Sequence, residues 1–115
     1  MTPRIAIVGL AITLTLGACS RADPLSVQDQ PGGDAVLLHV LTGPDSQAIC
    51  IRTSLSDGCD NETADVLITD FADIDDVHAE WIDDRNVQVT VASGKVVRAR
   101  PSSADGRFSI ALVGS

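Results

Sequence analysis

Short apolar runs with a period of two residues constrain the fold of this 115-residue chain more than any other feature. Clusters of Gly, Pro, Asp, Asn and Ser separate the runs, which are rich in valine and isoleucine. Such alternation predicts β-strands, because successive side chains of a strand point to opposite faces of a sheet. The runs cover residues 36–41, 48–52, 66–68, 77–81, 87–91, 97–100 and 108–112. We expect an all-β fold, a small antiparallel meander of about six to seven short strands that forms a curled sheet, a barrel or a sandwich.

One expected hairpin joins the runs at 87–91 and 97–100. If residues 92–94 form a three-residue loop, Val89 pairs with Val97, and the apolar side chains of both strands share one face. A two-residue loop would mix polar and apolar side chains on each face, so the three-residue loop is favoured.

A second three-residue loop within residues 83–86 keeps the same face apolar. Residues 77–100 therefore predict three consecutive antiparallel strands with one dry side. We expect that side to carry Val77, Ala79, Trp81, Val87, Val89, Val91 and Val97.

The N-terminal segment resembles the signal of bacterial lipoproteins. Arg4 precedes an apolar run over residues 5–16, and the small residues Gly17 and Ala18 lead to Cys19. The run is too short to span a bilayer as a helix. The resemblance to a lipobox implies cleavage before Cys19, which would be diacylated on its thiol and acylated again at the new N-terminus. A plain secretory signal and a membrane anchor helix are the alternatives.

This resemblance divides the chain into a signal peptide (1–18), a lipidated tether (19–33) and a small β domain (34–115). Residues 20–33 are polar and contain two prolines and two glycines, which is typical of a flexible tether. The implied location is the cell envelope, with the domain facing the periplasm and held by acyl chains. Ser20, which follows the cysteine in place of an aspartate, favours the outer membrane.

The charge of the chain excludes some partners. Removal of residues 1–18 takes away only Arg4, so 7 of 8 basic residues remain against 16 acidic ones, a net charge of −9. We expect such a chain to bind neither nucleic acid nor anionic lipid surfaces through charge.

The remaining cysteines, Cys50 and Cys59, are best explained as a disulfide in an oxidising compartment. Their spacing is not C-x-x-C, and no neighbouring histidine or cysteine completes a zinc set, which argues against a redox or metal pair. The bond closes a loop of about ten residues, which the chain-entropy model values at about 2.5–3 kcal/mol.

The segment Val77-x-x-x-Trp81-Ile82-Asp83-Asp84-x-x-Val87-x-Val89, preceded by residues 65–70, is similar to a family of small uncharacterised bacterial lipoproteins. Members share a lipobox, a cysteine in the first half and a related β-meander. The likeness covers about half of the mature chain. The family carries no assigned activity, so the resemblance implies only an anchored β domain. The preceding loop, residues 58–63, departs from the family's pattern.

Eleven acidic residues and no basic ones lie between Asp57 and Asp84. One interpretation is a calcium site in the loop formed by Asp70, Asp73, Asp75 and Asp76, because hard cations prefer several carboxylates. The loop lacks the glycine and the distal glutamate of an EF-hand. We favour solvated turns and strand faces, partly paired with the basic residues that follow, and therefore no metal and no cofactor.

Neither histidine stands in a pattern that predicts catalysis. His78 alternates with Asp76 and Glu80 on one strand face, and His39 is expected to lie half-buried in the first strand. No nearby nucleophile has an orienting partner, so the sequence does not predict an enzyme. Trp81 is expected in the core, and aromatic residues are too few to form a stacking platform.

The sequence favours a non-enzymatic, lipid-anchored β domain that binds or supports another envelope component. An inhibitor of a basic cell-wall hydrolase is the main alternative, because Ser103-Ala104-Asp105-Gly106-Arg107-Phe108 resembles a loop of the membrane-bound lysozyme inhibitors. The tyrosines and the tryptophan that follow this loop in those inhibitors are absent here. A calcium-binding module is the third reading.

Overall fold

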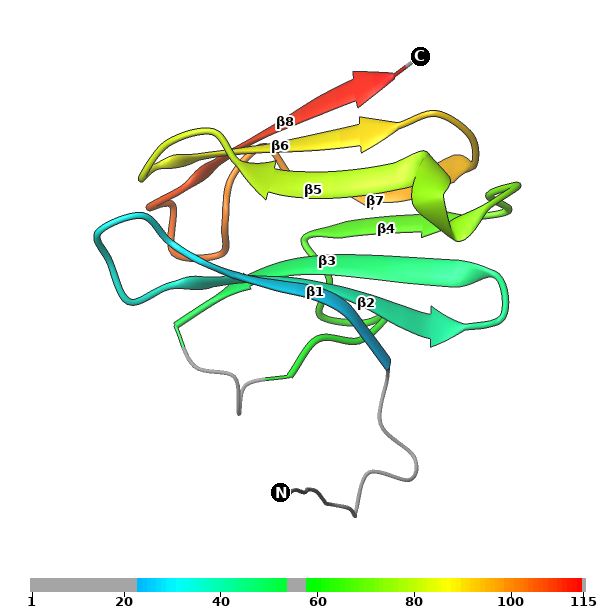
Figure 1. Cartoon of the computed structure of the whole chain (residues 1–115), viewed down its shortest axis with the longest axis horizontal. Helices are drawn as coiled ribbons and strands as arrows, with labels where there is room; N and C mark the ends of the chain where they lie inside the picture. Colours follow the sequence, from blue (N-terminus) through cyan, green and yellow to red (C-terminus); the bar gives the residue numbers. More distant parts are fainter. Residues whose placement is uncertain (1–22, 54–57, 115) are drawn as a thin grey trace, which may run out of the picture.

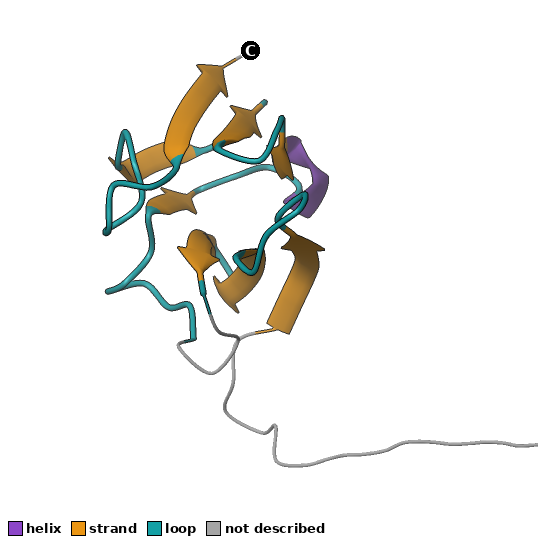
Figure 2. Cartoon of the chain, turned by 90° about the vertical axis from the view of Figure 1, so that its left-hand side faces the viewer, coloured by secondary structure: helices purple, strands orange, loops and turns teal. Residues whose placement is uncertain are grey.

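Eight strands form two open sheets that face each other as a sandwich (Figures 1 and 2). The computed structural model describes residues 23–53 and 58–114. The strands are β1 (Asp23–Asp29), β2 (Val36–Gly43), β3 (Ser46–Arg52), β4 (Val66–Thr69), β5 (Val77–Trp81), β6 (Asn86–Val91), β7 (Lys95–Ala99) and β8 (Ser109–Gly114). One sheet has the order β1-β2-β3-β4-β7 and the other β5-β6-β8. The all-β prediction is confirmed, and of its three variants the sandwich is the one formed.

The alternation in the sequence produces two apolar clusters. The larger one fills the space between the sheets, where Leu37, Ile49 and Ile68 meet Val87 and Val89. The smaller one covers the outer face of the five-stranded sheet, beneath the disulfide loop, and includes Leu38 and Cys50. Both faces of β2 and β3 are therefore buried, which explains the consecutive apolar residues 36–38 of β2 and 48–51 of β3.

The boundary of the expected tether differs from the structure. Asp23–Asp29, placed within the tether 19–33 from its polar composition, forms β1 and pairs antiparallel with β2. The strand lies at the edge of its sheet, and Val27 is exposed. A sheet edge needs few apolar side chains and tolerates Pro24, so composition alone did not reveal this strand.

The prediction of a hairpin between β6 and β7 is wrong. After Val91 the chain crosses to the other sheet, where β7 pairs with β4.

 Val66 pairs with Ala99 and Thr69 pairs with Lys95, with a bulge between them. Val97, expected on the dry face, is 53% exposed, whereas Val96 packs against the main core. The face of β7 is inverted because its hydrogen-bonding partner lies in the other sheet.

The hairpin between β5 and β6 has the expected form. Trp81 pairs with Val87, and the Ile82 N–H donates to the Asn86 carbonyl, so residues 83–85 form a three-residue tip. Asp83 accepts hydrogen bonds from the Arg85 and Asn86 N–H groups and thereby fixes the turn.

The last strand departs from an all-antiparallel meander. β8 lies beside β6 and runs parallel to it, with Val87 opposite Ile110. A parallel neighbour requires a crossover connection, which here is provided by β7 and residues 100–108. In the part of the chain that the structure describes, no helix has the length and apolar character needed to cross a membrane.

Candidate functional site: a cleft beside buried Asp65

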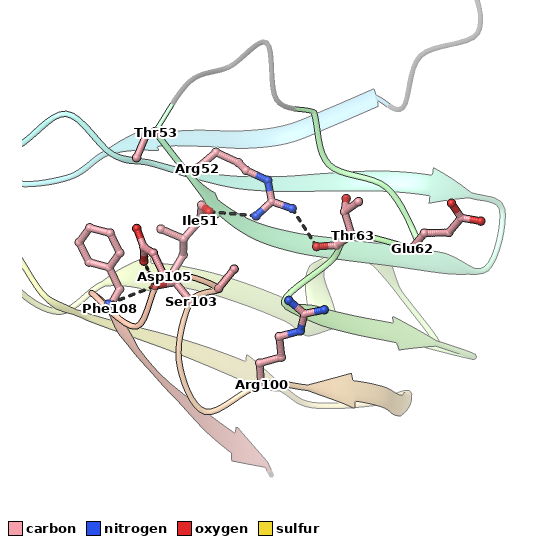
Figure 3. Close-up of a pocket in the computed structure, with 10 residues that line it drawn as sticks. Ile51, Arg52, Thr53, Glu62, Thr63, Arg100, Ser103, Asp105 and Phe108 are labelled. Atoms are coloured by element: carbon pink, nitrogen blue, oxygen red, sulfur yellow. Dashed lines mark hydrogen bonds between the residues drawn. The ribbon is translucent and has the colours of Figure 1, made fainter.

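A cleft of about 430 Å³ opens at one end of the sandwich (Figure 3). Its walls are residues 51–53 at the end of β3, residues 62 and 63, Arg100 after β7, and residues 103–105 and 108. The cleft forms because β4 starts only at Val66, so the last residues of β3 extend beyond their neighbouring strand. Volumes of this order are typical of sites for small ligands.

Asp65 is the polar centre of this end of the sandwich. Its side chain is fully buried, and its carboxylate lies 3.3 Å from Arg52 Nη1 and 3.6 Å from Arg100 Nη1. Its backbone N–H donates to Ile49 O, and its carbonyl accepts from Arg100 N–H. The sequence reasoning missed Asp65, because it is one of eleven acidic residues in a run and nothing in the pattern distinguishes it from a solvated aspartate.

Two side chains form hydrogen bonds with the backbone groups at the end of β3 that has no neighbouring strand on the β4 side. The Ile51 N–H donates to Asp65 Oδ2 at 2.9 Å, and Arg52 Nη1 donates to the Ile51 carbonyl at 2.9 Å. Arg52 also donates to the carbonyls of Gly58 and Thr63, so its guanidinium is held in place on several sides. Because the backbone groups of Ile51 are already bonded, a ligand in the cleft meets side chains rather than a free strand edge.

Arg100 is less constrained than Arg52. Its side chain is 42% exposed, against 14% for Arg52, and it approaches Asp65 Oδ1 at 3.6 Å. Figure 3 shows the two arginines on opposite walls, with both guanidinium groups directed toward the centre of the cleft. Two guanidinium groups share one buried carboxylate, and Glu62 and Asp105 also line the cleft, so charged groups of both signs surround it.

The loop of residues 103–108 forms the opposite rim of the cleft. Ser103 Oγ bonds Asp105 Oδ1 at 2.8 Å, and the Phe108 N–H donates to Ser103 Oγ. Gly106 has a φ of 76°, a left-handed conformation that glycine adopts without strain. Asp105 accepts a hydrogen bond from the Arg107 N–H, and this bond is the main reason that the pKa of the Asp105 carboxyl lies below its usual value. The loop therefore presents a rigid turn beside the cleft.

The predicted disulfide is confirmed and supports the cleft from the other side. Cys50 and Cys59 are joined, with their Cα atoms 5.9 Å apart. Arg98 reaches this loop from β7 and donates to the carbonyls of Asn61, Glu62 and Ala64. The bond and Arg98 together hold residues 58–64 against the sheet, and these residues include Glu62 and Thr63 of the cleft wall.

Of the four aspartates considered for calcium, Asp73 and Asp76 accept local hydrogen bonds through their side chains. Asp73 accepts from the Asp75 N–H, and Asp76 accepts from Ser93 Oγ at 2.6 Å. Asp70 has a φ of 59° at the end of β4. Within residues 23–53 and 58–114, no three histidine, cysteine, aspartate or glutamate side chains are grouped so that they could hold a metal ion.

The two histidines differ in environment. His39 is 5% exposed, more buried than expected, and its Nε2 lies 2.6 Å from Gln47 Oε1. Burial lowers the pKa of His39, although the hydrogen bond to Gln47 opposes this effect. His78 is exposed on β5, as the alternation predicts.

Trp81 packs against the main core but is not fully buried. Its ring meets Phe108 edge to face at 5.4 Å, and its indole N–H donates to Gln28 O of β1 at 2.9 Å. Gln28 in turn donates to Ala79 O. Trp81 therefore joins the two sheets at the edge opposite the crossover to β7.

Cys19 and the segment read as a signal lie outside the described residues. A scan against protein-family models matches no family, and searches of curated proteins and of solved structures find no significant similarity.

Proposed function

We propose that this chain is a lipid-anchored, non-enzymatic binding module of the bacterial cell envelope, and that its ligand binds in the cleft beside Asp65. The observation that carries the proposal is the position of the cleft relative to β1. Asp23, the first residue of β1, pairs with Leu41, whereas Asp29 at the other end pairs with Val36, which in turn pairs with Arg52 of the cleft. The start of β1 and the cleft therefore lie at opposite ends of the sandwich (Figure 1).

This arrangement suits a tethered receptor. If Cys19 is lipidated, only residues 20–22 separate it from β1, and an extended chain covers that interval with about 14 Å at most. The end of the domain at which β1 begins would then lie close to the membrane. The cleft would open away from it, because the seven residues of β1 add roughly 20 Å. A ligand in the aqueous compartment would reach the cleft without interference from the bilayer.

The anchor is tested by Cys19→Ser in the producing bacterium. The variant should leave the membrane fraction or remain uncleaved, and the wild-type N-terminal peptide should carry acyl chains by mass spectrometry. A Cys19→Ser protein that is processed normally and still fractionates with membranes would exclude lipidation at this position.

The cleft is tested by placing a photo-crosslinking amino acid at Ala104, on its rim, and at exposed Ala72 as a control. Ala72 follows β4 at the opposite end of the sandwich. A discrete adduct formed in the envelope from position 104 and not from position 72 is expected. Equal labelling from both positions, or none from position 104, would contradict a binding role for the cleft.

A second candidate is inhibition of a basic cell-wall hydrolase by the loop of residues 103–108. The loop forms a rigid turn around Ser103 and Asp105, and its exposed residues 104–107 lie at the end of the sandwich opposite the start of β1. Both features favour this function. Binding to hen lysozyme measured at low and moderate salt tests this function. Tight binding that Asp105→Ala weakens would support the inhibitor, whereas weak binding that disappears at moderate salt would reflect only the acidic charge of the chain.

A further inference from the structure

We propose that the cleft recognises the carboxylate of a small organic anion, with Arg100 as the binding residue. This inference rests on the proposed function and specifies the ligand of the same site. Its starting point is the loose contact between Asp65 and Arg100, which leaves the Arg100 guanidinium uncommitted. Asp65 Oδ1 is buried and, among the described residues, has no hydrogen-bond donor, although Arg100 Nη1 is only 3.6 Å away.

Arg100 has donors to spare. Within residues 23–53 and 58–114, its guanidinium makes the ion pair with Asp65 but no hydrogen bond. Arg52, by contrast, already donates to three strand or loop carbonyls and to the Asp65 carboxylate. A guanidinium that faces a cleft with unused donors is suited to a planar anion, which it binds through two parallel N–H···O bonds.

The placement of the charged groups favours an anion over a cation next to Arg100. Arg52 and Arg100 outnumber the single buried carboxylate of Asp65, and Asp105 on the far rim is engaged by Ser103 and paired with Arg107 at 3.7 Å. Glu62 stands exposed at the mouth. A bound carboxylate would use the Arg100 donors that no described residue takes, whereas a cation would lie beside two neighbouring guanidinium groups.

The residues that line the cleft indicate which chemical group is attached to the carboxylate of the ligand. Ile51, Ala104 and Phe108 contribute apolar surface beside Arg100. A cleft of about 430 Å³ whose lining includes both cationic and apolar side chains fits a carboxylate attached to a short apolar group. A free carboxylic acid and the C-terminus of a peptide share this chemistry. Strand addition to β3 is not the mode of binding, because Asp65 and Arg52 already bond the Ile51 backbone.

The test is an NMR titration of the full lipidated chain in detergent micelles, following the Arg100 Nε–H and Thr63 amide signals. The probes are 4-methylpentanoate, N-acetyl-Ala-Leu with a free carboxylate, the same dipeptide as its C-terminal amide, and inorganic phosphate. We expect saturable shifts with one or both carboxylates and binding at least tenfold weaker for the amide. Preference between the two carboxylates distinguishes a small acid from a peptide terminus. Equal binding of acid and amide, preference for phosphate, or no saturable shift with any probe would overturn the proposal.

Variants separate recognition from folding. Arg100→Gln should weaken carboxylate binding by roughly 10- to 150-fold, the effect of losing a charge-assisted hydrogen bond. Arg100→Lys keeps the charge beside Asp65 but lacks the planar fork, and should weaken binding several-fold with the fold intact. Lys95→Gln, at the other end of β7, removes the same charge and should leave binding unchanged. Unaltered affinity in Arg100→Lys and Arg100→Gln would refute the role of Arg100.

The photo-crosslinking experiment distinguishes failure of this inference from failure of the proposed function. If an adduct from position 104 persists in Arg100→Gln, the cleft binds its ligand by other means, and only the carboxylate assignment is lost. If no adduct forms even in the wild type, the binding role of the cleft fails as well.

Discussion

Asp65 should be the most sensitive single position in the described domain. Asp65→Asn keeps an oxygen acceptor for the Ile51 N–H but removes the charge that faces Arg52 and Arg100. Loss of one partner from a buried ion pair costs about 3–5 kcal/mol. Arg100 is partly solvated and recovers some of this loss through water, so the lower end, about 3 kcal/mol, is expected. Asp65→Ala also leaves the Ile51 N–H without an acceptor and should cost about 1–3 kcal/mol more.

The assay is urea unfolding at pH 7, followed by the fluorescence of Trp81. With a slope of about 1.5 kcal/mol/M, a loss of about 3 kcal/mol moves the midpoint down by about 2 M. Glu80→Gln, on the exposed face of β5, should leave the midpoint nearly unchanged and serves as the matched control. A midpoint for Asp65→Asn within about 0.5 M of the wild type would show that solvent satisfies both arginines without Asp65, and would remove its role as the polar centre of the cleft end.

Three further outcomes follow from the packing, the disulfide and the buried histidine. Trp81→Phe keeps a ring against the core but loses the hydrogen bond to Gln28 O, and should lower the unfolding free energy by about 1 kcal/mol, whereas Trp81→Ala should cost about 3 kcal/mol or more. Because both variants lack the only tryptophan of the chain, their urea unfolding and that of the wild type are followed by circular dichroism. Reduction of the Cys50–Cys59 bond should cost about 2.5–3 kcal/mol, and an unchanged melting temperature in reductant would contradict this. Because burial lowers the pKa of His39, the unfolded chain takes up a proton first as the pH falls, so stability should decline below about pH 6.5. His39→Gln should flatten that decline and exposed His78→Gln should preserve most of it; the reverse pattern would assign the effect to His78.

The sequence by itself determined the local features of this protein. The period of two marked seven of the eight strands, since the alternation of side chains between two faces arises within each strand. The Cys50–Cys59 bond and the three-residue tip of the β5–β6 hairpin were also predictable, because each joins residues that are close along the chain.

Only the tertiary structure decided which strands pair. Val96 and Val97 are both apolar, so alternation permits either face of β7 to be buried, and the choice follows from pairing with β4 in the other sheet. β1 has too few apolar residues to be predicted as a strand from the sequence. It forms a strand because the backbone groups at the edge of β2 are available to pair with it. The cleft arises in the same way. Asp65 and Arg100 are 35 positions apart, and they meet only because the sheet order places β7 beside β4. The cost of burying a carboxylate is offset there by the two neighbouring guanidinium groups.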